Sequence, residues 1–363
     1  MESDKKTRII AFYLPQFHPI PENDEWWGNG FTEWTNVGKA KPLFKGHYQP
    51  RVPADLGYYD LRVPEVREKQ AEIAGKHGIE GFCYWHYWFG NGKRLLERPF
   101  NEVLSSGKPD FPFCLAWANE SWKGFPHGLS NRNTLIEQLY PGIEDYENHF
   151  YNLLTAFRDE RYITFDGKPI FMVYMPFQLP NPKEFIVTWQ NLALKNGLKG
   201  MHFIAHVFQK ERIQEALDSG FDSVNINRLF DYGRFNRSLL FKVKLWLKRE
   251  LLKIPYYYNY KDVYPTFSGI EDEASNVFPT IIPGWDHSPR SGSHGLIYHK
   301  ASPELFEKHI KQVFDRVCHK NNEQRIIFLK SWNEWAEGNY VEPDLKYGMG
   351  FLEAISKSIN NSK

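Results

Sequence analysis

The chain has 363 residues, with 45 Lys and Arg against 44 Asp and Glu and a formal net charge of +1 at pH 7. This balance excludes a global electrostatic attraction to nucleic acid or to another polyanion. Aromatic residues make up 17% of the chain, which fits either a large aromatic core or a surface that binds flat, hydroxyl-bearing ligands such as sugars.

The N-terminal segment carries charges of both signs before an apolar run at residues 8–13. That run is too short for the core of a signal peptide. No stretch of about 20 apolar residues occurs elsewhere, so we expect a cytoplasmic protein. The cysteines Cys83, Cys114 and Cys318 are odd in number and scattered, which indicates buried, reduced thiols rather than a disulfide framework or a zinc site.

Short apolar runs alternate along the chain with amphipathic stretches of helical periodicity. The expected strands are residues 8–13, 79–88, 111–118, 168–175, 201–208, 222–229, 277–285 and 325–332. The clearest expected helices are residues 63–78, 92–107, 143–160, 182–197 and 302–320. About eight alternating units with continuously apolar strands predict an α/β fold, a (β/α)8 barrel that forms a single domain over residues 1–363. A doubly wound open sheet is the rival, but no glycine-rich turn follows the first strand.

Two long insertions interrupt this alternation. The first, about 14–62, would be the first βα-loop of the barrel and would lie on its catalytic face. The second, about 230–270, contains a helical segment at 237–253 in which Lys and Arg stand beside Leu, Phe and Trp. This segment is either a barrel helix with a solvated basic face, which we favour, or a helix that contacts an anionic membrane surface.

Polar and aromatic residues follow the apolar runs, at the end of a barrel where catalysis takes place. We expect substrate-binding side chains at these strand ends and in the first insertion: Tyr13, Trp34, His86, Trp88, Trp117, Asn119, Glu120, Trp122, His206, Trp285, Arg290, Trp332, Asn333 and Trp335. Among the tryptophans, at least two should line a groove and stack on sugar rings, from the set Trp26, Trp27, Trp34, Trp88, Trp117 and Trp122.

Two acidic motifs could carry glycosidic-bond chemistry, which needs one carboxyl group to protonate the leaving oxygen and a second to supply or activate the nucleophile. The stretch "SWNEWAEG" places Glu334 and Glu337 three residues apart. The stretch "WANESW" contains Glu120 after an Asn. In many barrel glycosidases an Asn-Glu acid/base follows the fourth strand, whereas Glu120 follows the third expected strand, so we assign it a binding or auxiliary role.

The motifs "NEWAEG", "NDEWWGNGFTEWTNV", "LAWANESW" and "PGWDHSPR" make the chain similar to the WbsX-type family of polysaccharide-cluster proteins, related to the endo-α-mannosidases of glycoside hydrolase family 99. The resemblance implies a (β/α)8 barrel without a metal or other cofactor, an oligosaccharide or polysaccharide substrate, and retention of anomeric configuration. The family 99 motif is Glu-Trp-His-Glu-Gly. Its two Glu match Glu334 and Glu337, and its His is Ala336 here.

By that resemblance, Glu334 is the base that deprotonates the substrate's own 2-hydroxyl, which attacks C1 to give a 1,2-anhydro sugar, and Glu337 is the general acid and then base. Three functions remain open: a retaining hydrolase of α-mannose-like linkages, a glycosyltransferase or transglycosylase of O-antigen or capsule biosynthesis, and a non-catalytic carbohydrate-binding protein. The pair of acids counts against the third. The lack of an Asp-x-Asp motif or a recognisable nucleotide-sugar fold counts against an ordinary transferase.

Overall fold

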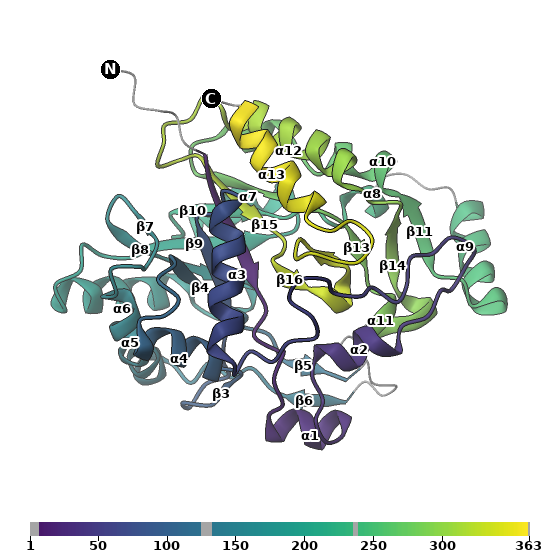
Figure 1. Cartoon of the computed structure of the whole chain (residues 1–363). Coiled ribbons are helices and arrows are strands. Elements are labelled where there is room, and N and C mark those ends of the chain that lie inside the picture. Colours follow the sequence, from purple (N-terminus) through teal and green to yellow (C-terminus); the bar gives the residue numbers. More distant parts are fainter. Residues whose placement is uncertain (1–6, 125–132, 235–238, 362–363) are drawn as a thin grey trace.

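A closed barrel of eight parallel strands forms the centre of the molecule (Figure 1). The computed structural model describes residues 7–124, 133–234 and 239–361. The barrel strands are, in chain order, β1 (Arg8–Tyr13), β2 (Gly81–Trp88), β4 (Phe113–Trp117), β8 (Lys168–Val173), β9 (His202–Val207), β10 (Ser223–Ile226), β12 (Val277–Ile281) and β15 (Ile326–Leu329). Strand β1 pairs with both β15 and β2, which closes the sheet. The prediction of a single-domain (β/α)8 barrel is confirmed.

The strands are almost completely buried because they carry apolar side chains toward the barrel interior and toward the outer helices. Inside the barrel, Phe12 stacks on Trp85 with 4.7 Å between ring centroids and on Phe328 with 5.3 Å. Strand β2 begins at a glycine for a steric reason: a Cβ on Gly81 would lie 2.3 Å from the carbonyl oxygen of Pro112 on the neighbouring strand.

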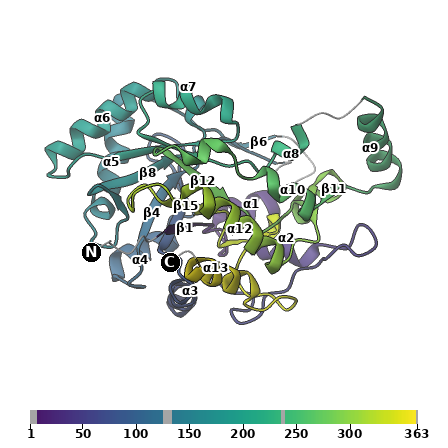
Figure 2. The same cartoon turned by 90° about the horizontal axis from the view of Figure 1, so that it is seen from above.

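Helices surround the barrel (Figures 1 and 2). They are α3 (Pro64–Lys76), α4 (Arg98–Ser106), α5 (Ile143–Phe157), α6 (Pro182–Lys195), α7 (Ile213–Asp218), α12 (Pro303–Val317) and α13 (Gly350–Asn361). Proline opens several of them, and Ser302 caps α12 by accepting a hydrogen bond from the amide of Leu305. The helix expected from residue 92 begins only at Arg98, because β3 (Arg94–Leu95) pairs back onto the end of β2.

Short elements fill the connections between the barrel units. The helices among them are α1 (Pro21–Trp27), α2 (Glu33–Lys39), α8 (Asp231–Arg234), α9 (Leu239–Leu252), α10 (Tyr260–Val263) and α11 (Ser288–Ser291). The strands are β5 (Trp122–Lys123), β6 (Thr134–Ile136), β7 (Thr164–Phe165), β11 (Tyr256–Asn259), β13 (Trp285–Asp286), β14 (Leu296–His299), β16 (Asn333–Glu334) and β17 (Asn339–Tyr340). Strands β11, β14 and β13 form a separate small sheet beside the barrel.

The cysteines lie in two kinds of environment. Cys83 and Cys114 are buried on the paired strands β2 and β4. Cys318 follows the last turn of α12 and is exposed, so the expectation that all three thiols are buried is wrong for this residue. Apolar residues precede Cys318 in the sequence, but the end of the helix turns toward solvent.

Candidate active site

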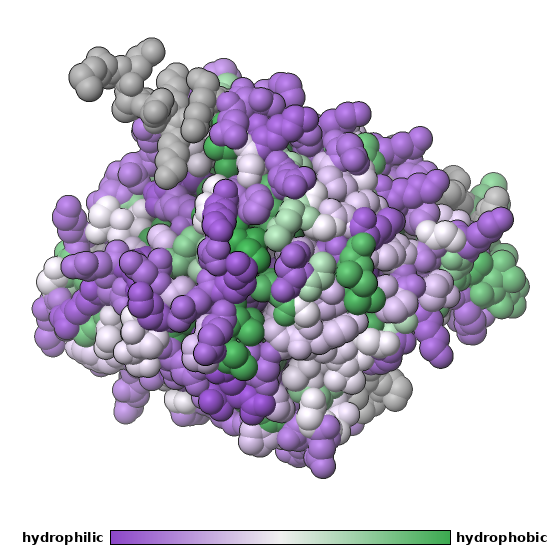
Figure 3. Space-filling view, viewed as in Figure 1, coloured by the Kyte–Doolittle hydropathy of each residue, from purple (hydrophilic) through white to green (hydrophobic). Residues whose placement is uncertain are grey.

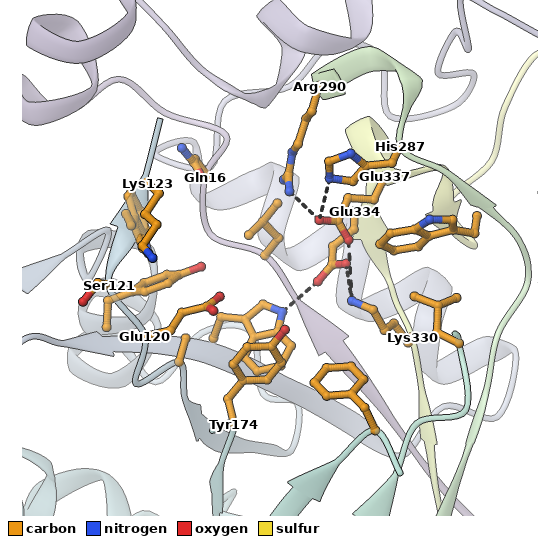
Figure 4. Close-up of a pocket in the computed structure, with 18 of the residues that line it drawn as sticks. Gln16, Glu120, Ser121, Lys123, Tyr174, His287, Arg290, Lys330, Glu334 and Glu337 are labelled. Atoms are coloured by element: carbon orange, nitrogen blue, oxygen red, sulfur yellow. Dashed lines mark hydrogen bonds and ion pairs between the residues drawn. The ribbon is translucent and has the colours of Figure 1, made fainter. Parts of the chain in front are cut away.

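A cavity of about 450 Å³ opens at the C-terminal ends of the barrel strands (Figure 4). This volume is within the range of small-ligand sites in proteins. Every barrel unit contributes at least one side chain or backbone segment to its wall. One representative from each, in chain order, is Leu14, Tyr87, Glu120, Tyr174, Phe208, Phe230, Trp285 and Lys330.

Glu334 lies at the bottom of the cavity, held in one orientation by three donors. The indole N–H of Trp85 donates to Oε1 at 2.8 Å, while Lys330 Nζ and Asn339 Nδ2 donate to Oε2 at 2.7 and 3.2 Å. Asn339 is opposite Glu334 in the β16–β17 pair, which brings its amide within reach. Burial raises the pKa of Glu334, Lys330 opposes this, and the neighbouring carboxylate of Glu337 raises the pKa further.

Glu337 lies at the end of the 3-10 turn Trp335–Glu337 and remains partly accessible from the cavity. Its Oε1 accepts a hydrogen bond from Arg290 Nη1, and its Oε2 lies 3.7 Å from Lys330 Nζ. Burial would raise the pKa of Glu337, but Arg290 and Lys330 together hold that pKa below its ordinary value. The turn ends at Gly338, with φ of 62°, where a Cβ would lie 2.7 Å from the side chain of Asp286.

The two cations between these carboxylates stay charged. Burial lowers the pKa of Lys330, but Glu334 and Glu337 raise it to above its ordinary value. Arg290, on α11, also pairs with Glu33 of the first insertion, with Nη2 3.0 Å from Oε1. The first insertion therefore reaches the catalytic end of the barrel and fixes the guanidinium that contacts Glu337.

A second contact joins the first insertion to the β12–β14 region beneath the cavity. The buried carboxylate of Asp286 contacts His47 Nε2 and accepts a hydrogen bond from Gln49 Nε2, both at 2.8 Å. It also accepts a hydrogen bond from the hydroxyl of Ser288 at 2.6 Å. These bonds fix the segment that carries Trp285 and Arg290 into the cavity.

Glu120 lies across the cavity from Glu334 and Glu337 (Figure 4). Burial raises its pKa to about 7, and the charge of Glu337 contributes in the same direction. In the part of the chain that the structure describes, no donor side chain hydrogen-bonds to its carboxylate. The cavity thus holds one carboxylate with a lowered pKa and two with raised ones, so a proton can be held on one group while its neighbour is ionised.

Six of the residues proposed from the sequence line the cavity together: Glu120, Trp122, Trp285, Arg290, Glu334 and Glu337. Of the six tryptophans proposed as walls, the lining of this cavity includes Trp122, and the stacking of at least two of the set on sugar rings stays a prediction. Trp26 instead packs edge-on against Trp122 at 5.9 Å. The indoles that form the walls are Trp85, Trp122 and Trp285.

The other proposed binding residues lie outside the lining. His206 lies inside the barrel, with its ring 5.8 Å from that of Phe12 and 5.2 Å from that of Tyr174, and the others lie in the layer between barrel and helices or in the loops. The side chain of Asn119 hydrogen-bonds to the backbone of Met175, and that of Asn333 hydrogen-bonds to the backbone of Leu14. Both asparagines therefore fix loops at the cavity without lining it. The remaining side chains are buried or partly buried against protein partners, which are Gln70 for Tyr13, Tyr59 for Trp34, His149 for His86, Asp145 for Trp88, the Trp88 carbonyl for Trp117, Asn225 for His206, Phe82 for Trp332 and Glu342 for Trp335.

Several lining residues are not among those predicted from the sequence, above all Lys330. It stands one residue before "SWNEWAEG", and a Lys directly after an apolar strand was the available signal. His287 is a second, with its Nε2 4.0 Å from Glu337 Oε1. Burial and Arg290 lower the pKa of His287 to about 3, so this imidazole is neutral.

Paired carboxylates beside fixed cations face aromatic walls at the C-terminal ends of the barrel strands, which is where (β/α)8-barrel enzymes have their active sites. The chain belongs to the WbsX family, because the family model described as "Glycosyltransferase WbsX" matches residues 9–355. Two strains of Xanthomonas campestris pv. campestris have a relative called WxcX, itself uncharacterized, which is 35% and 36% identical over 358 residues. That match covers 98% of this chain, and the chain spans about half the length of these relatives.

Solved structures share the fold at low identity. The GH99 endo-alpha-mannosidase from Bacteroides thetaiotaomicron superposes with a TM-score of 0.59 at 14% identity, covering 98% of this chain and 97% of that one. A structure described as a glycoside hydrolase-like protein gives a TM-score of 0.62 at 16% identity, covering 99% and 95%. The resemblance to the WbsX family and to the family 99 barrel is confirmed at the level of family and fold.

Proposed function

We propose that this protein is a retaining glycoside hydrolase that acts on an α-mannose-like linkage of a polysaccharide or glycan through a 1,2-anhydro sugar. The observation that carries the proposal is the pair Glu334 and Glu337, which face one cavity and are held there by Lys330 and Arg290. Aromatic walls from Trp85, Trp122 and Trp285 fit the apolar faces of sugar rings. The neutral overall charge suits a neutral glycan.

In the proposed first step, Glu334 removes the proton of the sugar 2-hydroxyl, and the 2-oxygen attacks C1. The bond from C1 to the leaving oxygen breaks, and Glu337 donates its proton to that oxygen. Water then attacks C1 of the anhydro sugar, with Glu337 taking the water proton and Glu334 returning its proton to the 2-oxygen. A raised pKa makes Glu334 a stronger base, which suits this role.

The productive protonation state is the reverse of the resting preference. Arg290 keeps Glu337 ionised in the empty cavity, whereas the first step needs the proton on Glu337 and none on Glu334. Only a minor fraction of the protein has this arrangement at any pH, and kcat/KM follows a bell-shaped curve set by the coupled pair. Entry of a neutral sugar beside Arg290 would weaken its contact with Glu337 and enlarge that fraction.

Glu120 is the competing proton donor, and Glu120→Gln separates its role from that of Glu337. We expect this variant to keep turnover within about tenfold of the wild type, because the leaving oxygen receives its proton from Glu337. Turnover of glycosides with poor and with good leaving groups should be measured. A large loss confined to poor leaving groups would instead make Glu120 the acid.

The same variant tests the cause of the Glu120 pKa. The pKa of Glu120 rises from 4.5 to about 7 in the folded protein, so the folded state binds this proton more tightly than the unfolded state does. The contribution of the proton to the free energy of unfolding is therefore fully present below pH 4.5 and is lost as the pH rises through about 7. Gln does not titrate, and Glu120→Gln should therefore melt at a higher temperature relative to wild type at pH 8 than at pH 5. An equal difference at both pH values would contradict the raised pKa.

Glycosyl transfer is the second candidate, favoured by the description of the family as a glycosyltransferase. A transglycosylase would use the same anhydro sugar but admit an acceptor hydroxyl in place of water. Incubation with α-mannosyl and α-rhamnosyl oligosaccharides, with and without nucleotide-sugar, followed by product masses, distinguishes the two. Release of shorter sugars without a donor supports hydrolysis, whereas products longer than the substrate support transfer.

A further inference from the structure

Helix α9 presents an uncovered apolar surface at the edge of the molecule. It belongs to the long connection between β10 and β12 and stands away from the barrel (Figure 2). Its exposed large apolar side chains, with exposed fractions from 41% to 82%, are Leu239, Leu240, Val243, Trp246, Leu247, Leu251 and Leu252. The space-filling view shows the resulting apolar patch over this helix (Figure 3). A patch of this density on one helix marks an interaction site.

One side of the helix is fixed to the protein. Lys248 Nζ lies 3.3 Å from the hydroxyl of Tyr257 and 4.5 Å from the centroid of its ring. The guanidinium of Arg249 lies 5.5 Å from the ring centroid of Tyr256 on the same strand, β11. Leu245 is half-buried. Among the side chains that the structure describes, apolar residues therefore lie on more than one side of the helix, and the side that meets β11 is partly covered.

The uncovered face has cations near its edges, of which Lys242 is exposed, while Lys248 and Arg249 are half-buried beside Tyr257 and Tyr256. At 100° per residue, Leu239, Leu240, Val243, Trp246, Leu247 and Leu251 occupy an arc of about 140°. By the same geometry, Lys242 and Arg249 flank one edge of that arc and Lys248 lies beyond the other. The one acidic residue within the arc, Glu250, pairs with Arg249 at 2.9 Å and with Lys253 at 4.0 Å.

We propose that α9 docks flat on a lipid bilayer that carries anionic headgroups, with its leucines in the interface and its cations at the phosphate level. An apolar stripe bordered by Lys and Arg, with a Trp among the leucines, is the pattern of an interfacial helix. Fourteen residues extend about 21 Å, too little to cross a hydrocarbon core of about 30 Å. Within the described residues, no helix is both long and apolar enough to span a membrane.

Charge favours a lipid surface over a second copy of this chain. Two copies that paired through this arc would bring Lys242 and Arg249 near the same cations of the partner copy, and Glu250, the acid within the arc, is already paired. Anionic headgroups satisfy those cations without a matching protein surface. The sequence segment 237–253 begins outside the described residues. In its described part the exposed side chains are largely apolar, and a solvated basic face does not account for them.

Docking would also orient the cavity. Leu229 and Phe230, which line it, precede α9 in the same β10–β12 connection. A helix held on the bilayer would therefore keep this wall of the cavity near the lipid surface. The docking inference does not depend on the proposed hydrolase activity, because it rests on α9 alone.

Flotation with vesicles tests the proposal on the full purified chain. The vesicles are phosphatidylcholine alone or phosphatidylcholine with phosphatidylglycerol, at low and high salt. We expect the wild type to float with the anionic vesicles at low salt, and the variant Leu240→Ser/Leu251→Ser to bind at least about tenfold more weakly. Lys242→Glu/Lys253→Glu should lose the preference for anionic vesicles.

The matched control is Leu194→Ser/Leu345→Ser, which changes two leucines that are 60% and 72% exposed elsewhere on the protein. It should float like the wild type. Absence of wild-type flotation with anionic vesicles at low salt would overturn the proposal. So would equal loss in the control variant, or a self-association in sedimentation that disappears in Leu240→Ser/Leu251→Ser without any vesicle binding, which would assign α9 to a contact between copies.

Discussion

Glu337→Gln is expected to lower turnover about 10²–10⁴-fold, the usual contribution of general acid–base catalysis. Gln keeps the shape of the side chain and an oxygen that accepts the hydrogen bond from Arg290, but it has no proton to donate. Only stabilisation of the transition state is removed, so kcat should fall while the affinity for an unreacted glycan stays nearly unchanged. Steady-state kinetics and calorimetric titration of the same preparation give both quantities.

The control is Glu33→Gln, on the other side of Arg290. Glu33 shares the guanidinium with Glu337 but is not part of the cavity lining, so its loss should reduce turnover by less than about tenfold. Thermal melting shows that each variant is folded. Wild-type turnover in Glu337→Gln would remove Glu337 from the role of acid, whereas an equal loss in both variants would assign the effect to the position of Arg290.

The barrel could be predicted because the sequence pattern that indicates it is repeated along the whole chain. Eight apolar runs separated by amphipathic helices each contribute to one conclusion, and an error of two or three residues at a strand end does not alter the fold. Strand β12, for example, ends at Ile281, four residues before the expected end, without changing its place in the sheet. The pair Glu334 and Glu337 could be found because two acids among tryptophans are conspicuous in any sequence.

The walls of the cavity could not be predicted, because adjacent strand residues point to opposite sides of the sheet. In "CYWHYW" the side chains of Trp85 and Tyr87 face the cavity, while His86 and Trp88 face the outer helices and contact His149 and Asp145. Both alternating sets are aromatic and polar, so the sequence gives no hydrophobic signal for the inward set. Which of the two sets points inward is determined by the register of β2 with its neighbouring strands, and this register is a property of the closed barrel.

Lys330 illustrates a second limit. A lysine that ends an apolar strand usually extends into solvent. Lys330 instead contacts the carboxylates of Glu334 and Glu337, which follow it in the sequence. Exposure of the apolar face of α9 is similar in kind. The apolar residues are plain in the sequence, but only the fold shows that no other element of the described chain covers them.

Glu334→Gln is expected to be at least as damaging as Glu337→Gln, because the proposed nucleophile is the substrate's own 2-hydroxyl and Glu334 is its base. Trp85, Lys330 and Asn339 hold this carboxylate in one orientation, so a shifted side chain cannot replace it. Loss of the 2-hydroxyl from the substrate should have the same effect on turnover by the wild type as the substitution Glu334→Gln has on turnover of the normal substrate. Such a substrate should bind and remain uncleaved.

A 2-deoxy or 2-fluoro glycoside with a good leaving group provides this test, read by product release and by the intact mass of the protein. No product and no adduct is the expected result. A stable covalent adduct would show that a carboxylate of the protein, and not the 2-oxygen, attacks C1. Repeating the reaction with Glu120→Gln would then identify the nucleophile: loss of the adduct would assign it to Glu120, which faces the pair across the cavity. An adduct that persists in Glu120→Gln would place the attack on Glu334 or Glu337, and peptide mapping would distinguish them.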